Sequence, residues 1–313
     1  MTAAAREHLL GVAGVLIAAV LWGTTGTAAT FAPEVSAVAI GAVAMGLGGL
    51  LQALVAAPRI RNVRCRLRLH WPWLLAGAVA VAIYPLAFYG SMRLSGVTIG
   101  TVVSIGSAPL LSALIESRFD GLTLGVRWRI GAALGLIGMG LLCLAETGPH
   151  AGAGSTTQML QGVAMGLVAG LTYAFYSWSA RRLMQGGIPA RAAMGATFGL
   201  GGLMLMPVLL LTGAPLLSSI SNAAVGLYMA LVPMFLGYLG FGYGLARVPA
   251  STATTITLFE PVVAALLAVV IVGERLPWLG WIGIALVIAC LVCLSAPVRW
   301  SRSRLNRAPS SVG

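Results

Sequence analysis

Residues 9–29 read LLGVAGVLIAAVLWGTTGTAA, a stretch without a charged side chain. A helix needs roughly 20 mostly apolar residues to cross a bilayer, and apolar stretches of that length recur almost to the C-terminus. Of the 313 residues, 59% are apolar and 8% are charged, whereas about 25% are charged in an ordinary soluble domain. We therefore expect most of the chain to lie in lipid.

Apolar runs between polar residues predict ten membrane-spanning helices in an all-α chain. Arg6 and His8 before the first run are typical of a signal peptide, but a retained first span is more economical because many spans follow. The spans are expected near residues 9–29, 35–56, 72–92, 96–115, 127–145, 159–180, 190–211, 223–246, 250–272 and 277–296. We expect residues 1–146 to form one five-helix repeat, 147–158 a connector, 159–296 a second repeat and 297–313 a basic tail.

The net charge of +12 comes from arginine alone, because the chain has no lysine. A basic balance raises the question of nucleic acid, but these arginines lie in short loops where the positive-inside rule explains them. With a cytoplasmic N-terminus, only Arg93 and Arg275 fall on the outer side. We therefore expect both termini in the cytoplasm and no nucleic-acid partner.

The two halves of the chain resemble each other in sequence. Because each half has an odd number of spans, equivalent helices cross the bilayer in opposite directions and the repeat is inverted. Inverted repeats are typical of secondary transporters, which hold a site near the bilayer midplane between the halves. The matched positions include Gly11 with Gly162, Trp22 with Tyr173, Tyr84 with Tyr238, Tyr89 with Tyr243, and Pro109 with Pro261.

Several motifs resemble those of the drug/metabolite transporter (DMT) superfamily and its EamA family: Leu21-Trp22-Gly23, Phe259-Glu260-Pro261 and Gly273-Glu274-Arg275. The resemblance covers essentially the whole chain, and the overall pattern is similar to YddG-like bacterial amino-acid exporters. It implies ten transmembrane helices, arranged as two inverted five-helix repeats around a central cavity, with the fifth and tenth spans at the periphery. One position departs from the pattern, because Leu122 stands where the second repeat has Glu274.

Glu260 lies about ten residues into the predicted ninth span and is the one acid deep within a predicted span. An acid at the middle of a membrane helix costs about 2.5–3.5 kcal/mol on insertion scales, and is therefore a functional-site hypothesis. Glu260 could bind the ammonium group of a substrate or carry a coupling proton. The alternative is a packing role, with the carboxyl group bonded to backbone groups that Pro261 leaves free.

Two rows of hydroxyl residues recur at every third position of the predicted fourth and ninth spans. Such rows could line a wet cavity, with Ser104, Ser107, Thr254 and Thr257 among its residues. Ser and Thr also mediate helix packing in membranes, and both interpretations remain open. The rows are Thr98, Thr101, Ser104 and Ser107, and Ser251, Thr254, Thr257 and Glu260.

Aromatic residues fall at matched positions of the two halves. Their rings could stack on an apolar or aromatic side chain and receive a cationic group on their faces. Trp and Tyr also anchor helices at the membrane interface, a role that suits Trp71 and Trp278. We expect Trp22, Tyr84 and Tyr173 to line a cavity, and the candidate set also includes Tyr89, Tyr176, Trp178, Tyr238 and Tyr243.

These observations predict a secondary transporter of the bacterial inner membrane that moves small metabolites out of the cytoplasm by alternating access. The resemblance implies amino acids, including aromatic and other neutral ones, as substrates. A multidrug or toxic-cation exporter, with Glu260 as counter-charge, is the alternative. We expect no enzyme, since His8, His70 and His150 lie outside the spans, and no ATP-driven transport, since no Walker motif is present.

We expect a small-molecule substrate and the lipid bilayer as partners, and leave the oligomeric state open. No cofactor or metal site is expected. Cys290 and Cys293 have a C-x-x-C spacing, but they lie in an apolar run without a second ligand pair, which favours packing.

Overall fold

The computed structural model describes residues 3–146, 156–272 and 275–295. These residues form helices and contain no strand, which confirms the predicted all-α fold class. The first half comprises α1 (Ala3–Gly23), α2 (Thr25–Ala29), α3 (Ala37–Asn62), α4 (Arg64–Leu69), α5 (Trp71–Ser95), α6 (Val97–Asp120) and α7 (Val126–Glu146). The second half comprises α8 (Thr156–Gln185), α9 (Ala190–Thr212), α10 (Ile220–Met229), α11 (Tyr238–Leu245), α12 (Ala250–Ile256), α13 (Glu260–Leu267) and α14 (Trp278–Ser295).

Among the described residues, nine helical segments are long and apolar enough to cross a membrane, and a tenth apolar helix, Trp278–Leu294, is shorter. Their backbone polar groups bond within each helix, as lipid requires. Large apolar side chains lie on the outside of the bundle, among them Leu210, Leu211 and Ile220, the last 91% exposed. Exposing so much apolar side-chain surface to water would be costly, whereas contact with lipid explains it. The predicted tail, most of the connector and the Gly273-Glu274 pair lie outside the described residues.

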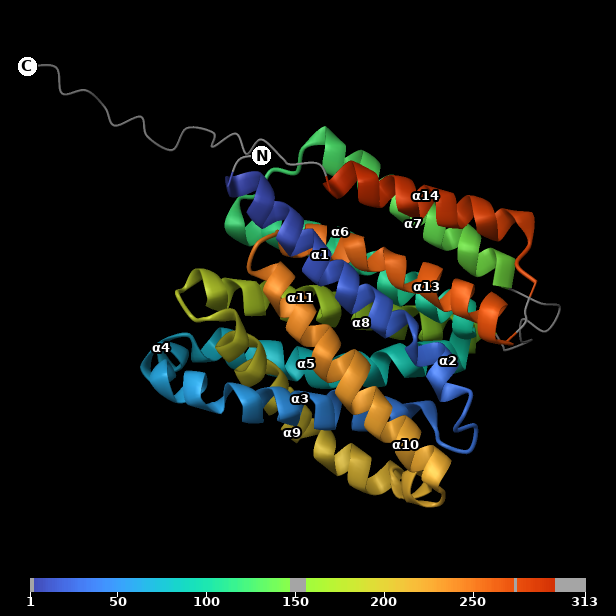
Figure 1. Ribbon diagram of the computed structural model, residues 1–313, viewed down its shortest axis with the longest axis horizontal. Coiled ribbons are helices and arrows are strands. Elements are labelled where there is room, and N and C mark those ends of the chain that lie inside the picture. The colour runs from blue at the N-terminus through green and yellow to red at the C-terminus, as the bar shows by residue number, and fades with distance from the viewer. Residues whose placement is uncertain (1–2, 147–155, 273–274, 296–313) are drawn as a thin grey trace, which may run out of the picture.

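Most of the large helix–helix interfaces join one helix of the first half to one of the second. Five of them pair α1 with α11, α3 with α9, α5 with α8, α6 with α12, and α7 with α14. Exchanging the two halves leaves this set of pairs unchanged, as two related repeats predict. Figure 1 shows α7 and α14 together at one edge of the bundle, the arrangement that the resemblance implies for the fifth and tenth spans.

Glycine brings α7 and α14 into close contact. A Cβ atom built on Gly138 would lie 2.7 Å from the Gly283 carbonyl oxygen, and one built on Gly283 would lie 2.6 Å from the Gly138 carbonyl oxygen. Only residues without a side chain allow the two backbones to approach in this way, which is typical of helix pairs in membranes.

The eighth and ninth spans depart from α-helical geometry near their middle. A π-helical segment, Ala230–Gly237, contains Pro233 and joins α10 to α11. A 3₁₀ turn, Thr257–Phe259, joins α12 to α13, which begins with Glu260 and Pro261. Proline removes an intrahelical hydrogen bond, and such irregular segments in membranes often line functional cavities.

The two ends of the bundle are named here by the short helices that mark them. The α4 end also contains the start of α1, the turn between α8 and α9, and the turn between α11 and α12, and lies on the left in Figure 1. The α2 end, on the right, also contains the link from α2 to α3. Every span runs from one end to the other.

Candidate functional site

A cavity of about 50 Å³ lies between the two halves, towards the α2 end. A cavity needs about 10–15 Å³ to hold one water molecule, so this one has room for a few. Residues of both halves form its wall, from α1, α2, α3 and α5 in the first and from α8, the π-helical segment Ala230–Gly237, α11 and α13 in the second. The lining residues are Trp22, Thr25, Gly41, Ala44, Met45, Tyr84, Pro85, Phe88, Tyr89, Tyr173, Tyr176, Met234, Tyr238 and Glu260.

The π-helical segment of the eighth span fixes Trp22 at the cavity wall. The Trp22 indole Nε1 donates a hydrogen bond of 2.9 Å to the Pro233 carbonyl oxygen. Gln52 Nε2 donates one of 3.2 Å to the Met234 carbonyl oxygen next along the chain. A carbonyl oxygen has two lone pairs, so it can accept these bonds beside a helical one. The first half is thereby bonded to the irregular segment of the second.

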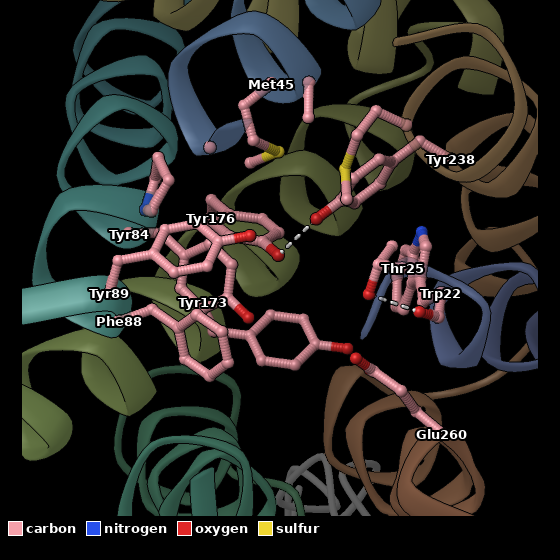
Figure 2. Close-up of a pocket in the computed structure, with 14 residues that line it drawn as sticks. Trp22, Thr25, Met45, Tyr84, Phe88, Tyr89, Tyr173, Tyr176, Tyr238 and Glu260 are labelled. Atoms are coloured by element: carbon pink, nitrogen blue, oxygen red, sulfur yellow. Dashed lines mark hydrogen bonds between the residues drawn. The ribbon is translucent and has the colours of Figure 1, made fainter. Parts of the chain in front are cut away.

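The aromatic residues at matched repeat positions meet around the cavity. Trp22 and its equivalent Tyr173 pack edge to face, with ring centroids 6.4 Å apart. Tyr238, the equivalent of Tyr84, lies 4.7 Å from Trp22, and Tyr84 lies 5.5 Å from Tyr173, again between centroids. Figure 2 shows these rings around one space. The sequence repeat therefore corresponds to one aromatic cluster rather than two separate ones.

Two hydroxyl contacts hold the buried tyrosines in place. Tyr176 and Tyr238 share a hydrogen bond of 2.9 Å between their hydroxyl oxygens. Tyr173 shares one of 2.9 Å with Thr257 Oγ1, in the 3₁₀ turn of the ninth span. Each buried hydroxyl thus has a partner, while its ring faces its neighbours. The resulting wall is rigid and largely apolar, with polar atoms at defined points.

Glu260 begins α13, immediately after the 3₁₀ turn, and its carboxylate points towards the tyrosine hydroxyls in Figure 2. Among the lining residues that the structure describes, it is the only charged one. An unpaired charge beside apolar rings is costly, and binding a proton or a cationic group would relieve that cost. The cavity therefore has the electrostatic character of a site for a proton or an ammonium group.

The structure brings together the predicted residues Trp22, Tyr84, Tyr89, Tyr173, Tyr176, Tyr238 and Glu260, but it places two predicted aromatics elsewhere. The Tyr243 side chain is 41% exposed, and the Arg247 guanidinium lies 3.6 Å from its ring centroid. Trp178 is buried near the α4 end, where its Nε1 donates a 2.7 Å hydrogen bond to Asp120. Neither of these two side chains is among the described residues that line this cavity, because composition alone does not say which way a ring points.

The hydroxyl rows pack helices, and Ser104, Ser107, Thr254 and Thr257 are not among the described residues that line this cavity. Thr254 Oγ1 donates to the Ala250 carbonyl oxygen at 2.9 Å. Ser107 Oγ donates to the Ser104 carbonyl oxygen at 3.4 Å, and the pair lies against Gly170 of α8. Thr257 stands one layer behind the wall, bonded to Tyr173. Ser and Thr can bond to their own helix, as Ser107 and Thr254 do here, and fill small spaces between helices.

Several lining residues were not predicted. Phe88 follows Tyr84 by one helical turn, and the two rings stack with centroids 5.7 Å apart, so their spacing of four residues was a usable signal. Met45 and Met234 gave no comparable signal, because a methionine in an apolar helix resembles any other core residue.

A second acid, Glu116 near the α4 end, is buried and was not predicted. Glu116 is 2% exposed. Its carboxylate accepts hydrogen bonds from the backbone N–H groups of Ala250 and Ser251, at 2.7 and 3.0 Å, and from Ser251 Oγ at 2.5 Å. The predicted fourth span ended at residue 115, whereas α6 continues to Asp120 and carries the acid among the other helices.

Three comparisons relate the chain to known proteins. The model of the EamA-like transporter family matches residues 9–144 and 160–296. The uncharacterized transporter YwfM of Bacillus subtilis (strain 168) is 33% identical, over 91% of this chain and 93% of its own length. The threonine/homoserine exporter RhtA of Escherichia coli (strain K12) is 28% identical, over 79% of this chain and 84% of its own.

A probable terminal-alkyne amino-acid exporter of Streptantibioticus cattleyicolor is 24% identical, over 88% of this chain and 93% of its own length. A solved crystal structure superposes with a TM-score of 0.74 at 20% identity, covering 92% of this chain and 96% of its own. At that identity the structural match supports the fold alone.

Proposed function

The chain belongs to the EamA-like transporter family, and on that premise we propose that it exports amino acids or closely related metabolites from the cytoplasm. Family membership confirms the resemblance found in the sequence, and the relatives are transporters rather than enzymes. Two relatives are named as amino-acid exporters, RhtA for threonine and homoserine. The observation that carries the proposal is the cavity between the halves, with a single carboxylate set among tyrosine rings.

The chemistry of the wall suits a substrate with an ammonium group and a mainly apolar side chain. Glu260 would pair with the ammonium group, and the ring faces of Tyr84 and Tyr173 would contact the side chain. Hydroxyl groups such as that of Tyr238 can donate to a carboxylate. The charge of the described wall is the negative charge of Glu260 alone, so a neutral amino acid fits better than an acidic one, whose extra carboxylate would be repelled.

The position of the cavity suggests which step of alternating access the structure represents. If the N-terminus is cytoplasmic, as the arginine distribution predicts, the α4 end faces the cytoplasm and the α2 end faces outward. The cavity lies towards the α2 end, and the buried rings of Phe198 and Phe241 stand on its α4 side. The structure then represents a state closed towards the cytoplasm.

A cation exporter is the second candidate, and the absence of any cationic side chain among the described residues of the cavity lining favours it. The carboxylate of an amino acid would find only hydroxyl donors there, whereas an organic cation would need none. Glu260→Gln separates the two candidates. It should abolish transport of a permanent cation, but leave transport of a neutral amino acid measurable, because the amide can still accept a hydrogen bond from an ammonium group.

The proposal is tested with purified protein in liposomes. Uptake of a panel of radiolabelled neutral amino acids is measured with and without a pH gradient, beside a fluorescent monovalent organic cation. We expect saturable uptake of at least one amino acid above empty vesicles, and stimulation by the gradient if Glu260 exchanges a proton for substrate. If every amino acid behaves as in empty vesicles while the cation is carried, the cation candidate replaces the proposal.

A further inference from the structure

Charged residues at the α4 end hold the turn between the eighth and ninth spans from both sides. Glu116, on α6, accepts three hydrogen bonds from the first two residues of α12. Arg181, on α8, donates from Nη1 to the carbonyl oxygens of Leu245 and Val248. The turn at residues 246–249 is therefore bonded to the carboxylate where α12 begins and to the guanidinium where α11 ends.

The acid and the base are paired with each other as well. Arg181 Nε lies 3.9 Å from Glu116 Oε1, and the two side chains are 14% and 2% exposed. A buried carboxylate is tolerated only when it is paired and fully hydrogen-bonded, and here four groups surround it. The N-terminus of a helical span adds a favourable dipole. Removing one of these partners should therefore strongly destabilise the closed arrangement around the Glu116 carboxylate.

This cluster joins parts of the chain that alternating access has to separate. Glu116 belongs to the first half, while Ala250 and Ser251 belong to the second. One turn further along, the hydroxyl oxygens of Thr254 and Ser112 share a hydrogen bond of 3.2 Å across the same pair of helices. The cavity cannot open towards the α4 end between α6 and α12 while these bonds persist.

The ninth span has a hinge between this cluster and the cavity. Glu260 follows Ala250 by ten residues, about 15 Å along a helix. The 3₁₀ turn Thr257–Phe259 and Pro261 interrupt the α-helix between α12 and α13. Hinges are typically a few residues at the ends of elements that absorb a change in backbone angles. α12 can pivot there while α13 keeps Glu260 at the cavity.

We propose that Glu116 and Ser251 form a latch that keeps the α4 end of the transporter closed, and that its release lets α12 swing at the 3₁₀ turn and opens the cavity to that end. Glu116 is then a positioning residue for transport and does not touch the substrate. The inference rests on alternating access in the proposed function, but not on the identity of the substrate.

The test measures access to the cavity from each side of the membrane. A thiol is introduced by Ala44→Cys, at a lining position, in a Cys65→Ser background, and its labelling by a membrane-impermeant maleimide is timed from either side. The same background without Ala44→Cys gives the contribution of the remaining cysteines. Native Cys65 is exposed in α4, so its reactivity in the parent protein identifies which side faces the α4 end.

Ser251→Ala removes one hydrogen bond to a buried carboxylate, a loss equivalent to about a tenfold change in an equilibrium constant. We expect labelling from the α4 side to become about tenfold faster, and Glu116→Gln to act in the same direction. Ser251→Thr keeps the hydroxyl group and should restore the original rate. Ser179→Ala is the matched control, because Ser179 Oγ donates one buried 2.6 Å bond to Trp73 on α5 and does not contact the turn.

The latch is refuted if Ser251→Ala labels from the α4 side at the parental rate, or if Ser179→Ala accelerates labelling equally. Should Glu116→Gln fail to fold, Ser251→Ala decides the matter alone, with its melting temperature compared with that of Ser179→Ala. Because labelling requires no substrate, a negative transport assay would overturn the proposed function and leave this result standing.

Discussion

Trp22 and Tyr173 occupy equivalent positions of the two sequence repeats, and their rings meet edge to face, 6.4 Å apart between centroids, at a single cavity. Two residues 151 positions apart in an inverted repeat come together only where the two halves enclose a common space. Their contact links the sequence repeat to the candidate site.

Replacing Trp22 should cost stability as well as transport. Trp22→Phe removes the donor to the Pro233 carbonyl oxygen, and loss of a buried hydrogen bond costs about 1–3 kcal/mol. We expect a lower melting temperature in detergent. Trp281→Phe is the control, because that side chain is 51% exposed and surface changes usually stay within about 0.5 kcal/mol. Equal melting temperatures for the two variants would contradict the bond's importance.

Glu260 should determine affinity for an ammonium group. A hydrogen bond to a charged group contributes about 1.5–3 kcal/mol, so we expect Glu260→Gln to raise the KM for a transported amino acid about tenfold or more. Uptake kinetics in liposomes measure this change. Glu34→Gln removes an exposed acid outside the cavity and should leave the KM unchanged. An unaltered KM in Glu260→Gln would assign that residue to packing instead.

Tyr89 and Tyr243 are equivalent in the repeat but differ in environment, since Tyr89 lines the cavity and Tyr243 is exposed beneath Arg247. Tyr89→Leu should weaken substrate binding, measured as a higher Kd by isothermal titration calorimetry. Tyr243→Leu should leave the Kd within about twofold, because it removes only a surface cation–π contact of roughly 0.5–1 kcal/mol. The reverse order would place the binding site elsewhere.

Close packing of α7 on α14 gives a prediction within one helix. Gly138→Ala forces a methyl group to within 2.7 Å of the Gly283 carbonyl oxygen, whereas a Cβ atom on Gly140 meets nothing within 4 Å. Overpacking costs about 1–3 kcal/mol, so Gly138→Ala should lower the melting temperature. Gly140→Ala should keep or raise it, because alanine favours the helix. If Gly138→Ala kept the parental melting temperature as Gly140→Ala does, α7 and α14 would be able to move apart without cost.

The orientation of the chain can be tested with its own cysteine. Cys65 lies exposed in α4, while Cys143 and Cys290 are buried. If the N-terminus is cytoplasmic, an impermeant maleimide should modify Cys65 in inside-out vesicles and not in intact spheroplasts. Cys65→Ser supplies the background. Modification of Cys65 in spheroplasts would invert the proposed topology and, with it, the direction in which the cavity opens.

The architecture was predictable because it depends on sums over many residues. Apolar length and the internal repeat each average over whole spans, so an error at one position is diluted. Residues with unusual chemistry, such as Trp22 and Glu260, stand out because an aromatic pair or an acid inside lipid is conspicuous, and the structure places both at the cavity. Span boundaries depend on single residues, and ending the fourth span at residue 115 concealed Glu116.

The composition and order of the residues by themselves determined a lipid-embedded helical chain with two related halves. Only the tertiary structure decided which face of each helix points inward, because lipid and protein interior are both apolar and leave little periodicity to distinguish them. It placed Tyr89 at the cavity and Tyr243 outside, turned the hydroxyl row of Ser251 and Thr254 into helix contacts, and brought Glu116 to the start of α12. The contacts of Ser251 with Glu116 and of Thr254 with Ser112 join residues more than a hundred positions apart, so no local pattern could encode them.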